Sequence, residues 1–206
     1  MEPIVVEHPL LAHALTVLRD RETGTADFRL NAAIASQLML IEATRDLQLS
    51  ARTIITPLTA TEGSALDERI VVVPVLRAGL AMLMAVQDML LDAAVGFVGL
   101  ERDEETAVAR EYYQKLPDVH DADRVLVLDP MLATGGSLDD TVDILKAKGC
   151  RNISLICIVA APEGLERIQQ KHPEIQVYTA ALDASLNEQK FIVPGLGDFG
   201  DRFFGT

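Results

Sequence analysis

Continuous runs of apolar residues, separated by segments of helical character, constrain the fold of this chain more than any other feature. Four runs have the length of β-strands and a shorter fifth follows, at residues 70–76, 93–100, 125–128, 153–160 and 175–178. Helix-like segments lie between them at residues 79–91, 137–148 and 162–171. Strands without alternating polar residues are buried on both faces, as in a parallel sheet covered by helices on each side. We therefore predict an α/β fold whose central sheet is open and mostly parallel.

Both ends of the chain depart from this alternation. Apolar residues recur at helical spacing in two N-terminal stretches, first Leu10, Leu11, Ala14, Leu15 and Leu18, then Ile34, Leu38, Ile41 and Leu47. We expect an N-terminal helical segment at about residues 1–50, attached as an appendage. The C-terminal end is rich in glycine and phenylalanine, and we expect it to be irregular. A length of 206 residues without a repeat or flexible linker predicts a single domain, residues 1–206.

The charge balance narrows the choice of partners. The chain has 18 Lys+Arg against 31 Asp+Glu, a formal net charge of −13. Nucleic acids bind to surfaces where Lys and Arg are clustered, and a chain with this excess of acidic residues is not expected to have such a surface. We therefore expect no nucleic-acid partner. No apolar run approaches the roughly 18 residues of a membrane helix. The first residues carry Glu2, Glu7 and His8 where a signal peptide has a basic patch. We expect a cytoplasmic protein with no membrane partner.

Cysteine and histidine give no sign of a metal site. Cys150 and Cys157 lack CxxC spacing, and Cys157 lies inside an apolar run, so we interpret it as a buried packing residue. The four histidines are scattered and form no pair at metal-ligand spacing. This pattern argues against a zinc enzyme.

Two well-known patterns in the C-terminal tail are rejected. Residues 195–200 match G-x-G-x-x-G, and residues 198–200 spell the Asp-Phe-Gly triplet of protein kinases. A dinucleotide site needs a strand, a following helix and an acidic residue about 20 positions on, which the six residues after Gly200 cannot supply. A kinase needs a catalytic loop and far more chain. We interpret this segment as a mobile, glycine-rich loop with one acidic residue at the sheet edge.

The most informative stretch runs from residue 124 to residue 148. A buried strand ends at Asp129, and a loop containing Thr134-Gly135-Gly136-Ser137 leads into an amphipathic helix. Glycines let successive N–H groups point at one spot, and the helix start adds partial positive charge, which suits a phosphate monoester. Asp129 is placed to accept hydrogen bonds from the vicinal hydroxyls of a ribose. The alternative without function is an ordinary βα turn capped by Ser137. The loop is not a Walker A loop, because the sequence contains no such motif.

Strand, Asp, loop, Thr-Gly-Gly and helix in this order resemble the phosphoribosylpyrophosphate (PRPP) loop of the type I phosphoribosyltransferases. The motif DPMLATGGS at 129–137, with Pro130 in place of a second acidic residue, is similar to the motif of the uracil branch of that family. Further similar blocks are HPLLAHAL at 8–15, VPVLRAGL at 73–80, RDEET at 102–106, YYQKLP at 112–117, AAPEG at 160–164 and PGLGDFGDRFFGT at 194–206. The resemblance spans nearly the whole chain.

The resemblance implies a role for each matching residue. PRPP-binding roles fall on Arg77, Arg102, Asp129, Pro130, Met131, Leu132, Ala133, Thr134, Gly135, Gly136, Ser137 and Asp198. Uracil-binding roles fall on Ile192, Gly197, Asp198 and Phe199, within a base-recognition hood at about residues 183–206. No dedicated catalytic residue is implied, with Arg102 and Asp198 as candidates. Mg²⁺ is the implied cofactor, carried mainly by PRPP, so no certain protein ligand is expected.

Several details refine these roles. We expect Arg77 to be held between an apolar strand and an apolar helix. The polar segment that Arg102 opens is interpreted as a flexible arm over the site, and Tyr112 and Tyr113 either anchor its returning limb or simply pack. Phe203 and Phe204 are predicted to pin the tail onto the core. Phe199 stands where many bacterial members have a small residue, so the shape of the uracil pocket can differ from theirs. Ile41 stands where the family commonly has a Tyr, so a regulatory or subunit contact that this Tyr makes in relatives is not expected here.

The implied activity is the formation of UMP and pyrophosphate from uracil and PRPP in pyrimidine salvage. Family members form dimers or higher assemblies and some are activated by GTP, so a homo-oligomer and a GTP effector are expectations without a site. Three alternatives remain: a phosphoribosyltransferase for another base, a nucleotide-sensing or RNA-binding regulator on this scaffold, and a purely structural protein.

The acidic charge sets a problem for this function. Residues 121–140 contain five acids and one base, a local charge of −4, around a loop that should hold a phosphate. We expect uncharged backbone N–H donors and Mg²⁺ arriving with the substrate to offset that field.

Overall fold

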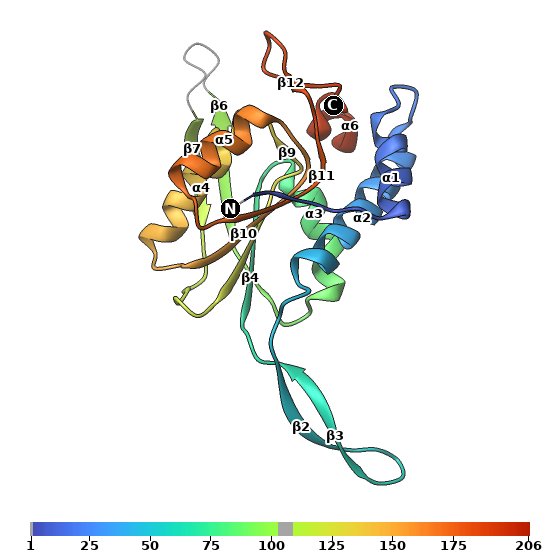
Figure 1. The fold of residues 1–206 in the computed structure, drawn as a ribbon, viewed down its shortest axis with the longest axis vertical. Coiled ribbons are helices and arrows are strands. Elements are labelled where there is room, and N and C mark those ends of the chain that lie inside the picture. The colour runs from blue at the N-terminus through green and yellow to red at the C-terminus, as the bar shows by residue number, and fades with distance from the viewer. Residues whose placement is uncertain (1, 103–108) are drawn as a thin grey trace.

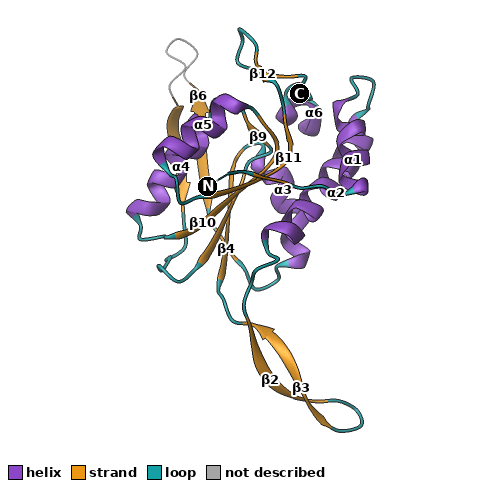
Figure 2. Ribbon diagram, in the orientation of Figure 1, coloured by secondary structure: helices purple, strands orange, loops and turns teal. Residues whose placement is uncertain are grey.

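The computed structural model describes residues 2–102 and 109–206, and among these residues a nine-stranded sheet forms the centre of the molecule (Figures 1 and 2). Seven strands follow the order β1-β11-β10-β8-β4-β6-β7, and the short strands β5 and β9 pair with β4 and β10. Every pair in this sheet is parallel except β6 with β7. The predicted open, mostly parallel sheet is confirmed.

The bounds of β4, β8 and β10 agree closely with the apolar runs, whereas the run at 93–100 is divided between β5 and β6, and β1 and β7 were not predicted. The strands of the central sheet are β1 (Ile4–Val5), β4 (Ile70–Leu76), β5 (Ala94–Val95), β6 (Phe97–Arg102), β7 (Ala109–Lys115), β8 (Arg124–Leu128), β9 (Met131–Leu132), β10 (Asn152–Ala160) and β11 (Gln176–Leu182). The helices are α1 (Pro9–Arg19), α2 (Thr25–Ala43), α3 (Gly79–Val86), a 3₁₀ turn η1 (Gln87–Met89), α4 (Gly136–Ala147), α5 (Pro162–Lys171) and α6 (Phe199–Phe204).

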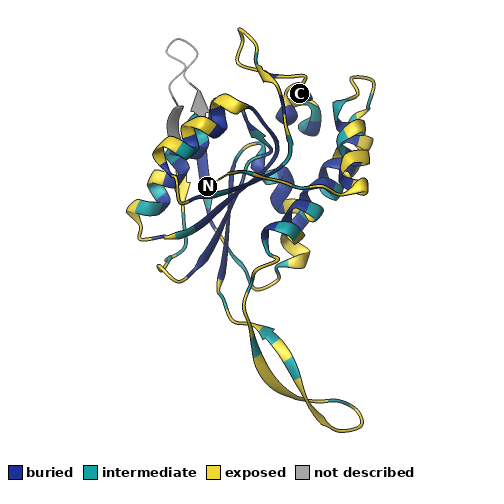
Figure 3. Cartoon of the chain, viewed as in Figure 1, coloured by how far each residue is buried: buried dark blue, intermediate teal, exposed yellow. Residues whose placement is uncertain are grey.

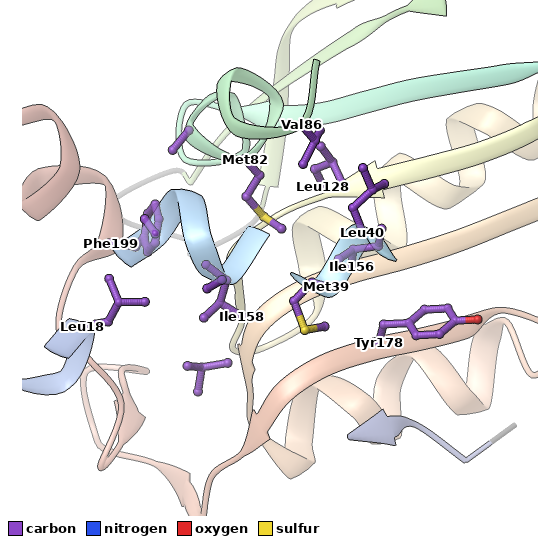
Figure 4. Close-up of a cluster of buried hydrophobic side chains, with 14 of the residues drawn as sticks. Leu18, Met39, Leu40, Met82, Val86, Leu128, Ile156, Ile158, Tyr178 and Phe199 are labelled. Carbon is purple, nitrogen blue, oxygen red and sulfur yellow. The ribbon is translucent and has the colours of Figure 1, made fainter. Parts of the chain in front are cut away.

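Alternate residues of each central strand face two separate hydrophobic layers. On β4, Ile70 and Val72 join the core under α1, α2 and α3, whereas Val71 and Val73 join the core under α4 and α5. Figure 4 shows the first of these layers, in which Met39 and Met82 lie among branched side chains from the sheet. Continuous apolar strands were expected for this reason, since each side of the strand meets a helix.

The N-terminal helices are not an appendage, which corrects the prediction. α1 and α2 cover one face of the sheet, and β1 before them adds an edge strand by pairing with β11 (Figure 1). The buried side of α2 also differs from the predicted stripe, because Met39 and Leu40 are buried while Ile41 is 50% exposed. Three consecutive large apolar residues occupy more than one face of a helix, so spacing alone did not select the buried one.

A β-hairpin between α2 and β4 was not predicted. β2 (Leu49–Ile55) and β3 (Ala60–Leu66) pair antiparallel and extend away from the rest of the molecule (Figures 1 and 3). Both strands are largely exposed, and Ile55 and Leu58 are 87% and 95% exposed at the outer end. The hairpin lacks a buried face in this chain, so no apolar period marked it.

The C-terminal end is ordered rather than irregular, which also corrects the prediction. β12 (Ser185–Leu186) and β13 (Ile192–Val193) form a small antiparallel pair, and α6 follows. A short helix does therefore follow the glycine motif. Among the described residues, no helix is both long and apolar enough to span a membrane.

Candidate functional site

The predicted phosphate loop connects β8 to α4 at the carboxyl end of the sheet. Asp129 directly follows β8, β9 pairs with β10, and α4 begins at Gly136 rather than at the predicted Ser137. Gly135 is the N-cap residue with φ +76°, and a Cβ atom there would lie 2.9 Å from the Gly164 carbonyl oxygen. A left-handed backbone packed this closely against a neighbouring chain segment requires glycine.

The predicted PRPP-binding residues of this loop divide into two kinds. Pro130 and Leu132 are buried, and their carbonyl oxygens accept hydrogen bonds from Ile158 and Ala161 of the adjacent segment. They shape the loop and offer no side chain to a ligand. Met131, Ala133, Thr134, Gly136 and Ser137 are partly exposed.

Asp129 has an unusual environment for a carboxylate. It is half-buried, and its Oδ1 accepts a hydrogen bond of 3.3 Å from the Met131 N–H. Burial raises the pKa of Asp129 to about 7, against the opposing effect of that hydrogen bond. A half-buried acceptor with few internal donors is suited to receive hydrogen bonds from hydroxyl groups of a ligand.

A cavity of about 260 Å³ lies between this loop and the C-terminal segment. The phosphate loop contributes Met131 and Ala133 to its lining, and the turn after β4 contributes Ala78. The C-terminal segment contributes Gln189, Lys190, Phe191, Ile192, Gly197, Asp198, Phe199 and Gly200. The fold thus brings residues predicted to bind PRPP and residues predicted to bind uracil to one cavity.

Some lining residues were missed by the sequence analysis. Among these, Lys190 has φ +66°, the one positive φ at a non-glycine residue in the described chain. Its backbone closes a turn, donating from its N–H to the Asn187 carbonyl at 3.0 Å. A left-handed lysine carries no signature in the sequence, so only the fold reveals it.

Arginine side chains hold the C-terminal segment over the cavity. Arg19 of α1 pairs with both carboxylate oxygens of Asp183, at 2.6 and 2.8 Å, and also donates to the Gly195 carbonyl at 2.8 Å. The Gly195 N–H donates to the same Asp183 at 2.8 Å. Arg202 of α6 donates to the carbonyl oxygens of Leu18, Leu196 and Asp20, and its guanidinium lies 4.4 Å from the Phe28 ring centroid.

The phenylalanines of this segment serve mainly to anchor it. The Phe199 side chain is 1% exposed and lies in the cluster of Figure 4, 5.2 Å from the ring of Phe28 and 5.9 Å from that of Phe203. Its ring therefore points into the core, which leaves its backbone as the part nearer the cavity. Phe203 is buried and Phe204 packs on it edge-on, as the pinning prediction required.

The two predicted pyrophosphate arginines differ in what the structure describes. The Arg77 side chain is 65% exposed and is not held between strand and helix, with Nη2 3.9 Å from Asp201 Oδ1 of α6. Arg102 ends β6, but its side chain lies outside the described residues, as do residues 103–108 in the middle of the predicted arm. Tyr112 and Tyr113 on β7 are half exposed, and Tyr112 crosses Gly99, where a Cβ would lie 2.7 Å from its ring.

A group of possible metal ligands lies away from the cavity. Asp139, Asp143 and His172 place one ligand atom each within 4.8 Å of one another. Asp139 is already paired with Arg167, Lys171 and His172, so its charge is satisfied without a metal ion. The sequence missed this grouping because it joins α4 to the end of α5. Cys157 is fully buried, as predicted, and burial raises the pKa of its thiol to about 12.

The sheet, the glycine loop after a central strand and the C-terminal hood define the fold of the type I phosphoribosyltransferases. An APRTase from Giardia lamblia superposes with a TM-score of 0.56 at 15% identity, over 84% of this chain and 97% of that chain. A hypoxanthine-guanine phosphoribosyltransferase from Bacillus anthracis gives 0.53 at 12% identity, over 77% and 80%. A solved protein from Aquifex aeolicus gives 0.93 at 35% identity, over 100% and 99%.

Sequence comparison then specifies the family. The family model described as uracil phosphoribosyltransferase matches residues 5–206. The uracil phosphoribosyltransferase of Campylobacter fetus is 48% identical over 202 residues, which cover 98% of this chain and 97% of that protein. That of Dictyoglomus thermophilum is 48% identical over 204 residues, covering 98% and 99%. The chain belongs to the uracil phosphoribosyltransferase family.

Proposed function

We propose that the chain transfers the 5-phosphoribosyl group of PRPP to N1 of uracil, forming UMP and pyrophosphate, in pyrimidine salvage. The observation that carries this proposal is the shared cavity, lined on one side by the phosphate loop and on the other by the hood. A phosphorylated sugar held by the loop would present its anomeric carbon to a base held by the hood. The bond from that carbon to pyrophosphate breaks, the bond to N1 forms, and the N1 proton leaves to solvent.

Each side of the cavity offers groups suited to one substrate. Backbone N–H groups at the start of α4 are uncharged donors for the sugar phosphate, and Asp129 is an acceptor for ribose hydroxyls. Gly197 and Asp198 are exposed at the hood, where the backbone can pair with the N3–H and two carbonyls of uracil. Because no side chain is suited as a dedicated base, catalysis would come from positioning the two reactants and stabilising the leaving group.

Mg²⁺ dependence is part of the proposal, and the donor chemistry of the cavity is compatible with it. Mg²⁺ prefers oxygen ligands and keeps several waters while riding on substrate phosphates, so it needs few protein ligands. Asp198 is exposed at the cavity and can meet such an ion or its water. When bound, the ion would neutralise charge on the departing pyrophosphate. Arg77, close to α6, and Arg102 would assist by pairing with phosphate oxygens.

The test is a base panel with the purified protein. Uracil, cytosine, orotate and hypoxanthine are each incubated with PRPP, with and without Mg²⁺, and products are separated. We expect uracil to be the one base of the panel that is converted to its nucleotide, UMP, and we expect this reaction to require Mg²⁺. Nucleotide formed from a different base would assign the enzyme to that base, and no product from any base would contradict the proposal.

Two further parts of the proposal concern regulation and assembly. GTP activation rests on family resemblance and is tested by repeating the uracil assay with GTP added. Homo-oligomerisation has support from the hairpin of β2 and β3, whose Leu49, Ile55 and Leu58 are 63%, 87% and 95% exposed. Apolar side chains on a projecting element are typical of a surface that meets another chain. Sedimentation velocity measures the assembly directly.

A further inference from the structure

A fully buried carboxylate lies in the first turn of the helix that follows the phosphate loop. The Asp139 side chain is 0% exposed, and it is surrounded by two basic side chains of α5 and by His172, which follows that helix. Lys171 Nζ and Arg167 Nε each donate to Oδ2 at 2.7 Å, and His172 Nε2 lies 3.0 Å from Oδ1. Burial opposes ionisation, but these hydrogen bonds hold the pKa of Asp139 below its usual range, so the group is a carboxylate.

One of these partners extends to the phosphate loop. A Cβ atom added at Gly135 would lie 3.4 Å from Arg167 Cδ, and one added at Gly136 would lie 3.9 Å from Arg167 Nη1. Arg167 Nε and Nη2 are both engaged with Asp139, at 2.7 Å each. Nη1 is the end of the guanidinium that faces Gly136, and among the described residues it has no acceptor. The Arg167 side chain is 42% exposed, so solvent and ligands can reach it.

The sequence spacing hides this arrangement. Counted along residues 121–140, the loop has a local charge of −4, which disfavours a phosphate. In space, α5 brings Arg167 and Lys171 to the same place, and they neutralise Asp139. The cation next to the glycines is therefore supplied by a helix some thirty residues further along the chain.

We propose that Arg167 is a further phosphate-binding residue, which Asp139 orients so that Nη1 donates to the 5′-phosphate of the sugar held by the Thr134–Gly136 loop. This inference rests on the proposed function and deepens it by assigning a charged donor to the phosphate subsite. The guanidinium is suited to the task because it can hold a carboxylate with one edge and a phosphate oxygen with its remaining nitrogen. Asp139 acts as a positioning residue and does not touch the ligand.

Lys171 provides a matched control. It bonds the same Asp139 oxygen at the same 2.7 Å and carries the same charge, but it follows Arg167 by one helical turn. Its ammonium is not among the atoms within 4 Å of a Cβ added at Gly136. Comparing Arg167→Gln with Lys171→Gln therefore separates direct phosphate contact from the general loss of one positive charge beside Asp139.

The experiment measures ribose 5-phosphate binding by isothermal titration calorimetry, together with the KM for PRPP and for uracil. A hydrogen bond to a charged group predicts a Kd for ribose 5-phosphate about 10- to 100-fold weaker in Arg167→Gln, with a similar rise in the KM for PRPP. Lys171→Gln should stay within about threefold of the wild type, and the KM for uracil should not change in either variant. Arg167→Lys should bind ribose 5-phosphate nearly as weakly as Arg167→Gln, because one ammonium nitrogen cannot occupy both the Nε position beside Asp139 and the Nη1 position beside Gly136.

Two results would overturn the inference. One is an unchanged Kd in Arg167→Gln, and the other is an equal loss in both glutamine variants, which would indicate a diffuse charge effect. Both outcomes leave the proposed function intact, because wild-type protein would still bind ribose 5-phosphate and form UMP. Wild-type protein that neither binds ribose 5-phosphate nor forms UMP would overturn the function and the inference together.

Discussion

Two glycine-containing segments meet at the cavity, and they are held in place by different means. The phosphate loop lies between a buried strand and a helix, and backbone contacts with residues 158–164 fix its path. The hood segment lies on no large sheet, and side chains fix it: Arg19, Asp183 and Arg202 bind its backbone. The first mode needs particular glycines, and the second needs particular charged side chains, of which Arg19 lies far away in the sequence. Mutations should therefore damage the two halves of the cavity in different ways.

The largest expected effect is in the phosphate loop. Gly135→Val places a branched side chain at φ +76° and against the Gly164 carbonyl, so the loop must move. We expect ribose 5-phosphate affinity to fall more than about 100-fold, since several N–H donors lose their common direction. Gly149→Val is the control, because Gly149 also has positive φ, at +95°, but has open space around it. It should lose about 1–2 kcal/mol of stability and keep its affinity. Equal affinity in the two variants would contradict the loop assignment.

Asp129→Asn tests the acceptor at the end of β8. The pKa of about 7 means that wild-type Asp129 becomes a carboxylate only near neutral pH, so kcat/KM for PRPP should rise through pH 7. At pH 8 the variant should be about 10- to 100-fold less efficient with PRPP, and its acid limb near pH 7 should be absent. A pH profile that is unchanged by the substitution would remove Asp129 from the ribose contact.

The same substitution should change stability with the opposite sign. The folded pKa of Asp129 is raised above the roughly 3.9 of an unfolded chain, so the wild-type protein loses stability as pH rises from about 4 to about 7. Asp129→Asn has no such loss and should be more stable at pH 8, by on the order of 2 kcal/mol. Chemical denaturation at pH 5 and pH 8 measures the difference.

On the hood side, Arg19→Met removes the side chain that joins α1 to Asp183. Asp183 keeps a nearly buried side chain, 5% exposed, and loses its ion pair, which costs about 3 kcal/mol of stability. The KM for uracil should rise about tenfold while ribose 5-phosphate affinity stays unchanged, because the phosphate loop does not use this contact. Arg21→Met is the control, since Arg21 and Glu22 form an exposed pair worth little. A parallel loss of both affinities in Arg19→Met would mean that the two halves are not independently held.

The smallest expected effect concerns Lys190. Its left-handed backbone is unfavourable for a residue with a Cβ, so Lys190→Gly should raise stability by up to about 1 kcal/mol, or a few degrees in Tm. Lys148 offers the control, because its φ is −89° and glycine there only adds unfolded-state freedom. Lys148→Gly should lower Tm slightly. A fall in Tm for Lys190→Gly would show that its side chain stabilises the hood.

This contrast also explains what the sequence could predict. β4 coincides with the apolar run at 70–76, and β10 differs from its run by one residue, because buried parallel strands need continuous apolar residues. The strand, Asp129 and glycine loop are contiguous, so their local pattern was sufficient. The hairpin of β2 and β3 was missed because it buries no face of its own. The buried side of α2 was misassigned because Ile41 and its neighbours are apolar on several sides.

The site was least predictable where it depends on distant pairs. Arg19 meets Asp183 across 164 residues, and Arg167 meets Asp139 across 28, with no periodicity that could mark either pair. The charge summed over residues 121–140 is negative because that sum leaves out Arg167 and Lys171 of α5, which pair with Asp139. The backbone roles of Pro130 and Leu132 were equally invisible, since burial and carbonyl hydrogen bonds follow from the fold.

The hydrogen bonds that Arg19 makes to Asp183 and Gly195 have a consequence for how the chain folds during synthesis on the ribosome. Domains form from their N-terminal part onward as the chain emerges, and contacts between distant residues form late. A nascent chain that has reached the end of α5 contains every residue of the phosphate loop and of the helices that support it. It still lacks Asp183, Gly195 and α6, so Arg19 of α1 has not yet met its partners. The hood side of the cavity is therefore completed only when residues 183–206 are in place.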